Sequence, residues 1–342
     1  MVISDIDSTI DSRKAELELW LEQIEGLADS DMTLASSDAS FRRYFRLQTT
    51  AKSFIAMDAP PPQEDCLPFV RIAGYLEAMG LNAPQIVEAD LERGFLLLSD
   101  LGATQYLQRL TAEPGEADKL YADAIAALLS MQSRGAAYQA QLPPYDAELL
   151  EFELSLFHDW LCGAHLGIRF SKDEESHWQD ICSMLIQNAL DQPQVFVHRD
   201  YHSRNLMVTN DQNPGILDFQ DAVEGAFTYD LVSLLKDCYI KWPAGQVQAW
   251  AEKFYSDLDA DTHAQVSMEQ FMRYFELMGV QRQLKAAGIF ARLQHRDGKS
   301  GYIADIPLCL SYVVEIAPRY DELAFLADVI ESRVLPAFEA DS

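Results

Sequence analysis

The chain has 342 residues, 49% of them hydrophobic, and a formal net charge of −28 at pH 7. This length and apolar content are enough for two lobes that share one cleft. The negative charge argues against nucleic acid or an anionic membrane as the main partner, because both need clustered lysine and arginine. It would suit a cationic substrate, but solubility alone explains it equally well.

The compartment is indicated by what the sequence lacks. No apolar run approaches the roughly 20 residues that cross a bilayer, and the first thirty residues are acidic and mixed, unlike a signal peptide. The five cysteines are odd in number, far apart and never in a CxxC pair, which argues against disulfides and thiolate zinc sites. We therefore expect a cytoplasmic protein with no membrane partner and with small buried thiols.

The first third of the chain predicts a small sheet. A helix period at Leu17, Leu21 and Ile24 predicts an amphipathic helix over 11–26. Four short strands and one helix are expected next, in the order strand, strand, helix, strand, strand; their ranges are 45–49, 54–57, 67–79, 85–89 and 94–102. This order is typical of an antiparallel sheet covered by one helix.

The remainder reads as mainly helical. Periodic segments predict helices at 116–134, 146–166, 172–190, 245–257, 267–293 and 319–340. Two short apolar runs, 195–197 and 215–217, interrupt them on either side of a polar loop and a turn at 211–214. We place the lobe boundary after Gly102, giving an N-lobe of residues 1–102 and a C-lobe of residues 103–342.

The polar loop between these two runs carries the strongest signal. His198-Arg199-Asp200 is followed by Asn205, and Leu217-Asp218-Phe219 comes after the turn. Phosphoryl transfer to an alcohol needs a carboxylate that accepts the hydroxyl proton and oxygen ligands for a metal bound to the triphosphate. Asp200 suits the first role, and Asn205 and Asp218 suit the second. Any one of them could be a turn former, but the ordered set favours a kinase site.

This pattern resembles the protein-kinase-like superfamily, and within it the aminoglycoside phosphotransferase and choline kinase branch. His202 stands where protein kinases carry a lysine, and Asp221 and Asp230 follow Asp218 with no long activation loop between them. The resemblance implies an α+β, bilobal fold, with a small N-lobe of antiparallel sheet plus helix that binds the nucleotide and a larger, mainly helical C-lobe that binds the acceptor. It also implies ATP and Mg²⁺ as cofactors and a structural role for Asp230.

Longer segments narrow the resemblance. SSDASFRRYFRL, FIAMDAPP, ILDFQDAVEGAFTYDLVSLLKDCYIKWP and GIFARLQHRDGKSGYIADIP are similar to bacterial kinases that phosphorylate the anomeric hydroxyl of N-acetylmuramate and N-acetylglucosamine in cell-wall (peptidoglycan) recycling. This similarity implies a small-molecule partner, an amino sugar, and a sugar 1-phosphate product. It leaves the oligomeric state open, and a monomer is compatible with it.

The nucleotide side departs from the kinase pattern. Kinase-like proteins pair a third-strand lysine with a glutamate on the next helix, but here Met57 takes the lysine position and the helix offers Arg71 and no glutamate. Arg43, Arg46 and Lys52 are the candidate replacement cations, and the sequence does not choose among them.

Other residues are expected to contact the nucleotide. Ser37, Asp38, Ala39 and Ser40 could wrap its phosphates with backbone N–H groups and hydroxyls, or they could form a plain hairpin turn. The hinge that meets adenine is expected at 98–101, with Leu98 and Asp100 as the binding residues. That segment could also be a core strand that runs into a turn.

The acceptor is expected to meet residues near the catalytic loop. Side chains that could bond sugar hydroxyls or the N-acetyl group are Tyr201, His202, Arg204, Gln220 and Asp221. Arg292, or Arg296, could bind a lactyl carboxylate, because a guanidinium matches a carboxylate with two parallel bonds. Each of these residues could instead be structural or solvated.

Two alternative functions stay open at this point. One keeps the kinase chemistry and changes the acceptor to an aminoglycoside or a choline-like cation, which the acidity favours. The other is a non-catalytic nucleotide-binding relative, suggested by the missing lysine and glutamate. Against the second, Asp200, Asn205 and Asp218 are all present.

Overall fold

The computed structural model describes residues 3–27, 30–37 and 41–341. Two compact units make up the chain. Unit 1 comprises Met1–Ala103 and Val208–Gln220, and unit 2 comprises Thr104–Met207 and Asp221–Ser342. An antiparallel sheet forms the centre of unit 1 and helices dominate unit 2, which confirms the α+β expectation.

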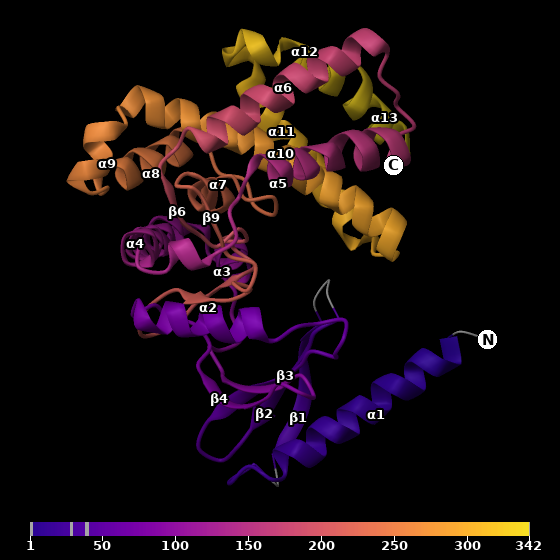
Figure 1. The fold of residues 1–342 in the computed structure, drawn as a ribbon, viewed down its shortest axis with the longest axis vertical. Coiled ribbons are helices and arrows are strands. Elements are labelled where there is room, and N and C mark those ends of the chain that lie inside the picture. Colours follow the sequence, from indigo (N-terminus) through magenta and orange to yellow (C-terminus); the bar gives the residue numbers. More distant parts are fainter. Residues whose placement is uncertain (1–2, 28–29, 38–40, 342) are drawn as a thin grey trace. The chain divides into compact units, whose positions relative to one another are not determined.

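Unit 1 is built on a five-stranded sheet in the order β1-β2-β3-β5-β4, in which all neighbours are antiparallel (Figure 1). Its elements are α1 (Ile3–Leu21), β1 (Asp31–Ser37), β2 (Arg43–Gln48), β3 (Ser53–Asp58), α2 (Leu67–Ala78), β4 (Ile86–Asp90), β5 (Phe95–Ser99) and, from the later segment, β8 (Gly215–Ile216). The predicted helix at 67–79 and the four predicted strands are confirmed within one or two residues, except that the last strand ends at Ser99 and not at residue 102.

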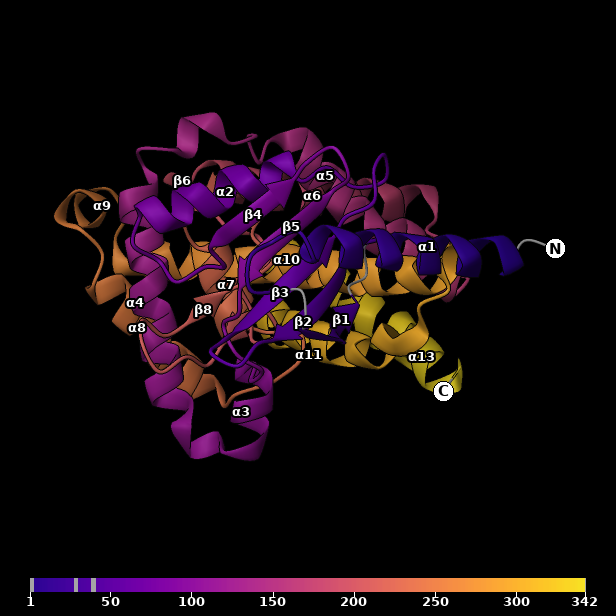
Figure 2. The ribbon, with the colours of Figure 1, turned by 90° about the horizontal axis from the view of Figure 1, so that it is seen from below.

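Helix α1 covers part of the sheet, as Figure 2 shows from below. Leu17, Trp20 and Leu21 pack with buried strand residues such as Phe45 and Leu97 in one apolar cluster. The apolar spacing therefore predicted the buried face correctly. The helix begins earlier than the predicted residue 11 and ends at Leu21, before a series of turns.

Strand β1 was not predicted. It is one of the two edge strands of the sheet, and its described residues pair with β2. Its Leu34 side chain is 63% exposed. An edge strand with mixed polar residues has little apolar alternation for sequence reasoning to detect.

Residues 208–220 belong to unit 1 although they lie far along the chain. The Ile216 backbone N–H donates to the Asn82 carbonyl (2.7 Å), and the Phe219 ring packs on Phe69 with centroids 4.7 Å apart. The predicted limits, 1–102 and 103–342, place this segment with the C-lobe instead. The functional division into a nucleotide-binding and a catalytic lobe stays a prediction.

Unit 2 is a helical body with a short hairpin-like sheet in which β6 pairs antiparallel with β9. Its α-helices and strands are α3 (Tyr106–Ala112), α4 (Ala117–Gly135), α5 (Ala147–Leu156), α6 (Lys172–Leu190), β6 (Gln194–Val197), β7 (Leu206–Met207), β9 (Val223–Ala226), α7 (Tyr229–Leu235), α8 (Ala244–Ser256), α9 (Ala260–Gln265), α10 (Met268–Asp297), α11 (Ile306–Ile316), α12 (Ala324–Val329) and α13 (Leu335–Asp341). Two π-helical segments, η3 (Phe157–His165) and η7 (Ile330–Val334), continue α5 and α12.

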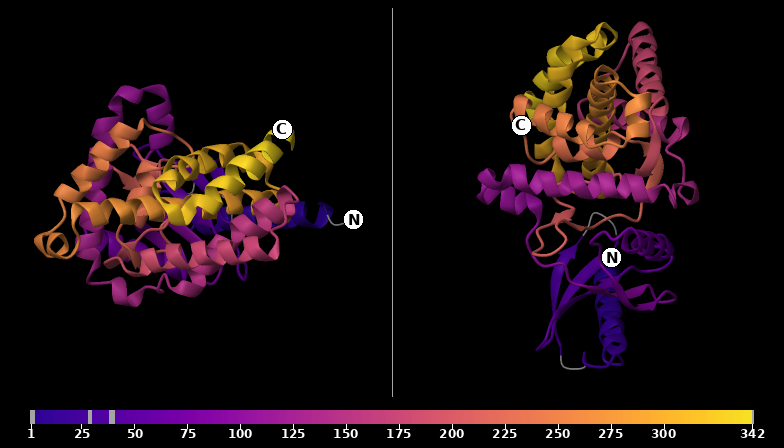
Figure 3. Two further views of the ribbon diagram at one scale, coloured as in Figure 1. Left: turned by 90° about the horizontal axis from the view of Figure 1, so that it is seen from above. Right: turned by 90° about the vertical axis from the view of Figure 1, so that its left-hand side faces the viewer.

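Helix α10 is the central element of unit 2. It contacts α5, η3, α6, α7 and α11, and the left view in Figure 3 shows other helices gathered along it. Because it is enclosed, α10 buries polar residues as well as apolar ones. Polar side chains in such a position need partners inside the protein, and several of them lie at the candidate site described below.

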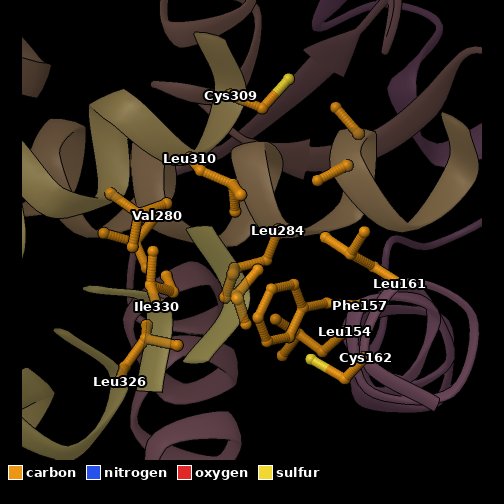
Figure 4. Close-up of a cluster of buried hydrophobic side chains, with 14 of the residues drawn as sticks. Leu154, Phe157, Leu161, Cys162, Val280, Leu284, Cys309, Leu310, Leu326 and Ile330 are labelled. Atoms are coloured by element: carbon orange, nitrogen blue, oxygen red, sulfur yellow. The ribbon is translucent and has the colours of Figure 1, made fainter. Parts of the chain in front are cut away.

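The apolar core of unit 2 forms where α5, η3, α10, α11 and α12 meet. Figure 4 shows Leu154 and Phe157 close to Leu284 of α10, with Leu310 and Ile330 from the later helices. All five cysteines are free and buried, as expected from the sequence. Burial raises the pKa of both Cys162 and Cys182 to about 12, so these thiols stay protonated at neutral pH.

Several elements of unit 2 were missed because they are short or lack a clear period; they are α3, β7, β9, α7, α9 and α11. The helix predicted over 319–340 begins only at Ala324. Two 3-10 turns precede it, and Tyr320 between them has an extended backbone, with φ −133° and ψ 113°. One extended residue ends the helical hydrogen bonding that the period implied.

One segment, 300–319, is long and apolar enough to cross a membrane, although the sequence reading had found no such run. Within it, Cys309, Leu310 and Val313 of α11 lie in the core cluster of unit 2. A core helix of a globular body passes the same test of length and composition.

The close approach of α10 to α5 gives a first prediction. A Cβ atom at Gly288 would lie 2.3 Å from the Leu156 carbonyl carbon and 2.5 Å from the Phe157 nitrogen, both backbone atoms. We expect Gly288→Ala to lower the free energy of unfolding by ~2 kcal/mol, because the two helices must separate. Thermal unfolding followed by circular dichroism measures this change.

The matched control is Gly74→Ala in α2, where an added Cβ would meet nothing within 4 Å. It should leave the melting temperature unchanged or raise it, since alanine is the better helix former by about 1 kcal/mol. Equal melting temperatures for the two variants would contradict the packing account.

Candidate active site

The loop His198–Asn205 follows β6 and is held by two carboxylates. Asp230 of α7 accepts hydrogen bonds from the backbone N–H groups of His198 (2.7 Å) and Arg199 (3.0 Å). Asp237 accepts one from the Ser203 N–H (2.9 Å). The structural role expected for Asp230 is confirmed. Burial raises the pKa of Asp230 to about 7.

The loop contains a residue in an unusual backbone conformation. Arg199 has φ 77°, in the left-handed region that residues other than glycine rarely adopt. Asp218, in the other part of the motif, has φ 61°. Such conformations cost free energy and persist only where surrounding contacts impose them, which is common at functional sites.

Glu153 of α5 supplies those contacts for Arg199. Its buried carboxylate pairs with the Arg199 guanidinium (2.6 Å) and with the Lys285 ammonium of α10 (2.9 Å). It also accepts hydrogen bonds from the Tyr145 hydroxyl and from Gln281 Nε2 (3.2 Å). Burial acts to raise the pKa of Glu153, but Lys285 and Arg199 outweigh it and hold the pKa below the usual range. Glu153 is therefore an anion that joins α5, α10 and the loop.

Asp200 lies half-buried in this surrounding. Its backbone is fixed, because its carbonyl accepts from His202 N (3.0 Å) and from Asn205 Nδ2 (3.0 Å). Among the described residues, no hydrogen bond or ion pair engages its carboxylate. Burial acts to raise the pKa of Asp200, but positive neighbours, led by Lys285, hold it below the usual value. The side chain is thus ionised and available to a hydroxyl group.

His202 and Asn205 lie on the same loop. His202 is 8% exposed, its ring meets Tyr239 edge to face, and its Nδ1 has no hydrogen-bond partner in the described part of the chain. Burial lowers the pKa of His202, so the ring is neutral at pH 7. The Asn205 amide nitrogen donates to Asp200, which turns its amide oxygen away from that carbonyl.

Arg204 lies flat on an aromatic side chain. Its guanidinium carbon is 3.6 Å from the centre of the Tyr239 ring, and one of its nitrogens is 3.9 Å from the Asp305 carboxylate. Tyr302 is on the outer side, 5.9 Å from the guanidinium. Stacking on a ring leaves the in-plane N–H donors of a guanidinium available.

The other predicted acceptor residues are spread more widely. Tyr201 is fully buried and its hydroxyl donates to the Ala124 carbonyl (2.9 Å), so we assign it a packing role. Asp221 is exposed, and Arg292 on α10 is half-buried. Arg296 is exposed and pairs with Asp297 (2.8 Å).

The second part of the motif lies in unit 1. Gln220 Nε2 donates to Asp218 Oδ1 (2.9 Å), which fixes one oxygen of that carboxylate. The left-handed backbone at Asp218 turns the chain directly after β8. Asn205, the other predicted metal ligand, belongs to unit 2.

The residues predicted to contact nucleotide are only partly described. Ser37 ends β1 and its side chain is not described, while Asp38, Ala39 and Ser40 lie outside the described residues. Leu98 is buried in β5. Asp100 follows that strand, and its carboxylate accepts from Arg46 Nε (2.7 Å) and from the Gly102 N–H (2.9 Å).

The three candidate cations are all engaged within unit 1. Arg43 pairs with the buried Asp58, which Arg13 also contacts. Arg46 pairs with Asp100, and the Lys52 ammonium lies 4.6 Å from the centre of the Phe54 ring.

Sequence reasoning missed another pair on the same sheet. Arg42, just before β2, forms an ion pair with Glu64 (3.0 Å), and each side chain is 10% exposed. Glu64 Oε1 also accepts from the Phe41 N–H (3.0 Å), directly after the predicted phosphate loop. Protein kinases pair a third-strand lysine with a glutamate on the following helix; here the cation stands just before β2 and the glutamate just before α2. Because Arg42 and Glu64 do not occupy the positions of the usual kinase lysine and glutamate, the sequence motif did not reveal this pair.

The chain is similar to a known protein family and to several named proteins. Residues 31–266 match the model of the phosphotransferase enzyme family. The chain is similar to a protein of Pseudomonas aeruginosa named N-acetylmuramate/N-acetylglucosamine kinase, with 45% identity over 94% of this chain and 97% of that protein. A protein of the same name from Neisseria meningitidis serogroup B is 40% identical over 91% and 93% of the two chains.

Solved structures share the fold at low sequence identity. A choline kinase from Streptococcus pneumoniae superposes with a TM-score of 0.62 at 13% identity, covering 86% of this chain and 97% of its own. An ADP-bound aminoglycoside phosphotransferase gives 0.57 at 15% identity, covering 87% and 97%. The expected kinase-like fold class is confirmed by these likenesses.

The loop geometry predicts the effect of changing Asp230. In Asp230→Asn, one carboxylate oxygen becomes an N–H₂ donor that faces a backbone N–H donor of the loop. Because both donors are buried, we expect a loss of about 1–3 kcal/mol in the free energy of unfolding and faster hydrogen exchange at His198 and Arg199.

Asp328→Asn on the exposed side of α12 is the matched control, and it should change neither quantity. The hydrogen-bond account would be refuted if the loop amides of Asp230→Asn exchanged at the rate measured in the unaltered protein.

Proposed function

Because the chain belongs to the phosphotransferase enzyme family, we propose that it is a Mg²⁺- and ATP-dependent kinase. The acceptor would be the anomeric hydroxyl of an N-acetyl amino sugar, N-acetylmuramate or N-acetylglucosamine. The chemistry is supported by the ionised, unengaged carboxylate of Asp200 on a rigid loop. The acceptor class is supported by relatives named for these two sugars at up to 46% identity.

In this proposal Asp200 is the catalytic base. It accepts a hydrogen bond from the sugar hydroxyl and takes the proton as the bond from oxygen to phosphorus forms. The negative charge of Asp200 is maintained by Lys285, Arg199 and Arg282, so no proton has to leave before catalysis. Loop contacts from Asp230 and Asp237 hold the base in place, which lowers the entropy cost of alignment.

Asn205 and Asp218 are the proposed magnesium ligands. Amide and carboxylate oxygens are the donors that Mg²⁺ prefers, and the hydrogen bonds of Asn205 Nδ2 and Asp218 Oδ1 fix how these side chains are turned. When bound, the ion would neutralise charge on the β- and γ-phosphates.

The nucleotide is proposed to contact unit 1. The backbone around Ser37, Asp38, Ala39 and Ser40 would cover the phosphates, and the segment with Leu98 and Asp100 would meet adenine. Arg43 remains a predicted contact. Arg42 is a stronger candidate for the phosphate cation, because its pair with Glu64 is the kind of cation and glutamate pair that kinases use.

The acceptor is proposed to lie over the loop side chains. His202 Nδ1 has no hydrogen-bond partner in the described chain, and Arg204, stacked on Tyr239, keeps its in-plane N–H donors available to a sugar. Gln220, Asp221 and Arg292 remain weaker candidates. A sugar 1-phosphate product would serve cell-wall recycling, and the ATP requirement is compatible with the expected cytoplasmic location.

The first experiment measures ADP release with Mg²⁺ and ATP against N-acetylmuramate, N-acetylglucosamine, kanamycin and choline. We expect saturable turnover only with the two N-acetyl sugars, and phosphorus NMR should show an anomeric phosphate. Turnover only with kanamycin or choline would overturn the acceptor and keep the kinase. Inactivity with all four would remove the support for an amino-sugar kinase.

Asp200→Asn tests the base. The variant keeps the size of the side chain but does not accept a proton, so kcat should fall by about 10²–10⁴-fold while ATP affinity and melting temperature stay unchanged. Asp328→Asn should retain full turnover. A variant at position 200 with near-normal kcat would show that another group is the base.

Arg42→Ala tests the phosphate contact. Loss of one charge-assisted contact should raise the KM for ATP by about 10-fold and leave the KM for the sugar nearly unchanged. Arg71→Ala, on the exposed face of α2, is the matched control. Equal ATP KM values for both variants would remove Arg42 from the site.

A further inference from the structure

Arg282 of α10 is a buried cation whose guanidinium lacks partners. Its side chain is 4% exposed, and its Nε and Nη1 atoms have no hydrogen-bond partner in the described part of the chain. Neither an ion pair nor a hydrogen bond involves any of its nitrogens there. A polar group in this position normally costs free energy unless something satisfies it.

Its neighbours on the same helix differ in this respect. Lys285, one turn away, pairs with Glu153 and donates to the Tyr229 hydroxyl (2.8 Å). Gln281 Nε2 donates to Glu153, and Gln283 Nε2 donates to the Lys236 carbonyl. Arg282 therefore differs from these three neighbours, while Nε of the half-buried Arg292 further along α10 also has no partner in the described chain. The spare donors of Arg282 suggest a ligand that is not part of the chain.

The guanidinium is charged and lies near the catalytic loop. Burial acts to lower the pKa of Arg282, but its neighbours, which include Asp237 and Asp200, outweigh burial and raise it. In turn, the charge of Arg282 contributes to lowering the pKa of Asp200 and of His202. Arg282 is therefore near enough to act electrostatically on Asp200, the proposed base that would accept the proton of the sugar hydroxyl.

We propose that Arg282 binds the carboxylate of the acceptor, and that it sets the preference of the site for an acidic over a neutral amino sugar. This inference rests on the proposed function. N-acetylmuramate differs from N-acetylglucosamine by a lactyl ether that ends in a carboxylate. A guanidinium holds such a group with two parallel hydrogen bonds, which also satisfies donors that the fold leaves open.

The net charge makes a local cation necessary. A protein with a formal charge of −28 repels an anionic substrate over most of its surface. An acid is then accepted only where positive charge gathers beside the reacting group. Arg282, Lys285 and Arg199 all act on Asp200, and the last two share one bonded counter-ion, Glu153. Of the three, Arg282 has no bonded carboxylate in the described part of the chain.

Arg292 is less suited to this role. It lies ten residues further along α10, and the charges that act on it are those of Arg296, Asp297 and Glu153. Asp200 and His202 are not among them. A helical rise of 1.5 Å per residue places Arg292 about 15 Å along the axis from Arg282. Substituting Arg282 and substituting Arg292 should therefore change the preference between the two sugars by different amounts.

The test compares two sugars with two variants. In Arg282→Gln, kcat/KM for N-acetylmuramate should fall by about 10–100-fold, which is the loss expected for hydrogen bonds to a charged group. The value for N-acetylglucosamine should change by less than about threefold, since no carboxylate is lost. Arg273→Gln, an exposed arginine of the same helix that pairs with Glu322, should alter neither value. Arg292→Gln should alter the ratio of the two values far less than Arg282→Gln.

Two outcomes would overturn the proposal. An equal loss with both sugars would mean that Arg282 acts on the phosphoryl group or on the loop, and no loss with either would mean that it binds neither. Turnover of N-acetylglucosamine by the unaltered protein reports on the proposed function separately. If that protein phosphorylated neither sugar, the proposed function itself would fail.

If Arg282→Gln does not fold, the carboxylate contact can still be tested by changing the substrate of the unaltered protein. The unaltered protein should use N-acetylmuramate at least about 10-fold more efficiently than its methyl ester, in which one added methyl group removes the charge. Equal efficiency for acid and ester would contradict a carboxylate contact. In a folded variant, the preference for the acid should disappear, and Arg282→Lys should restore part of it.

Discussion

The ion pairs of Glu153 with Arg199 and Lys285 are the contacts on which the rest of the site depends. They join α5, α10 and the catalytic loop through one buried carboxylate. Removing the carboxylate would leave both buried cations without their bonded counter-ion, which costs several kcal/mol, on the order of 3–5. The same contacts hold Arg199 in its left-handed conformation, and Asp200 is the next residue. Asp200, the proposed base, therefore follows a residue that is fixed by charges outside the proposed sugar site.

A second consequence concerns the distribution of charge. The protein is strongly acidic, yet Asp200 is surrounded by positive side chains that keep it ionised. Lys285 and Arg199 share Glu153 as a bonded counter-ion, while Arg282 has no bonded partner in the described chain. Paired cations stabilise the base, and an unpaired one leaves the site ready for an anionic ligand.

Sequence patterns predicted some elements and site residues and missed others. The ordered motif predicts Asp200, Asn205 and Asp218 as site residues, and the periodic segments located α1, α2 and most long helices. Edge strand β1 and the apolar helix α11 were missed, because neither has the alternation or period of its type. Glu153, Arg282 and the pair of Arg42 with Glu64 were also missed, since a charged residue in a helix or before a strand gives no sign of its burial.

The sequence by itself determined the chemistry, because that chemistry needs particular side chains in a fixed order along a short loop. It also determined the fold class, since hydrophobic period and turn residues act locally. Only the tertiary structure decided which charges meet. Glu153, Arg199 and Lys285 are brought together from three distant segments, and residues 208–220 join unit 1 through contacts with α2 and the residues that follow it. Contacts between distant segments depend on packing, which no local pattern encodes.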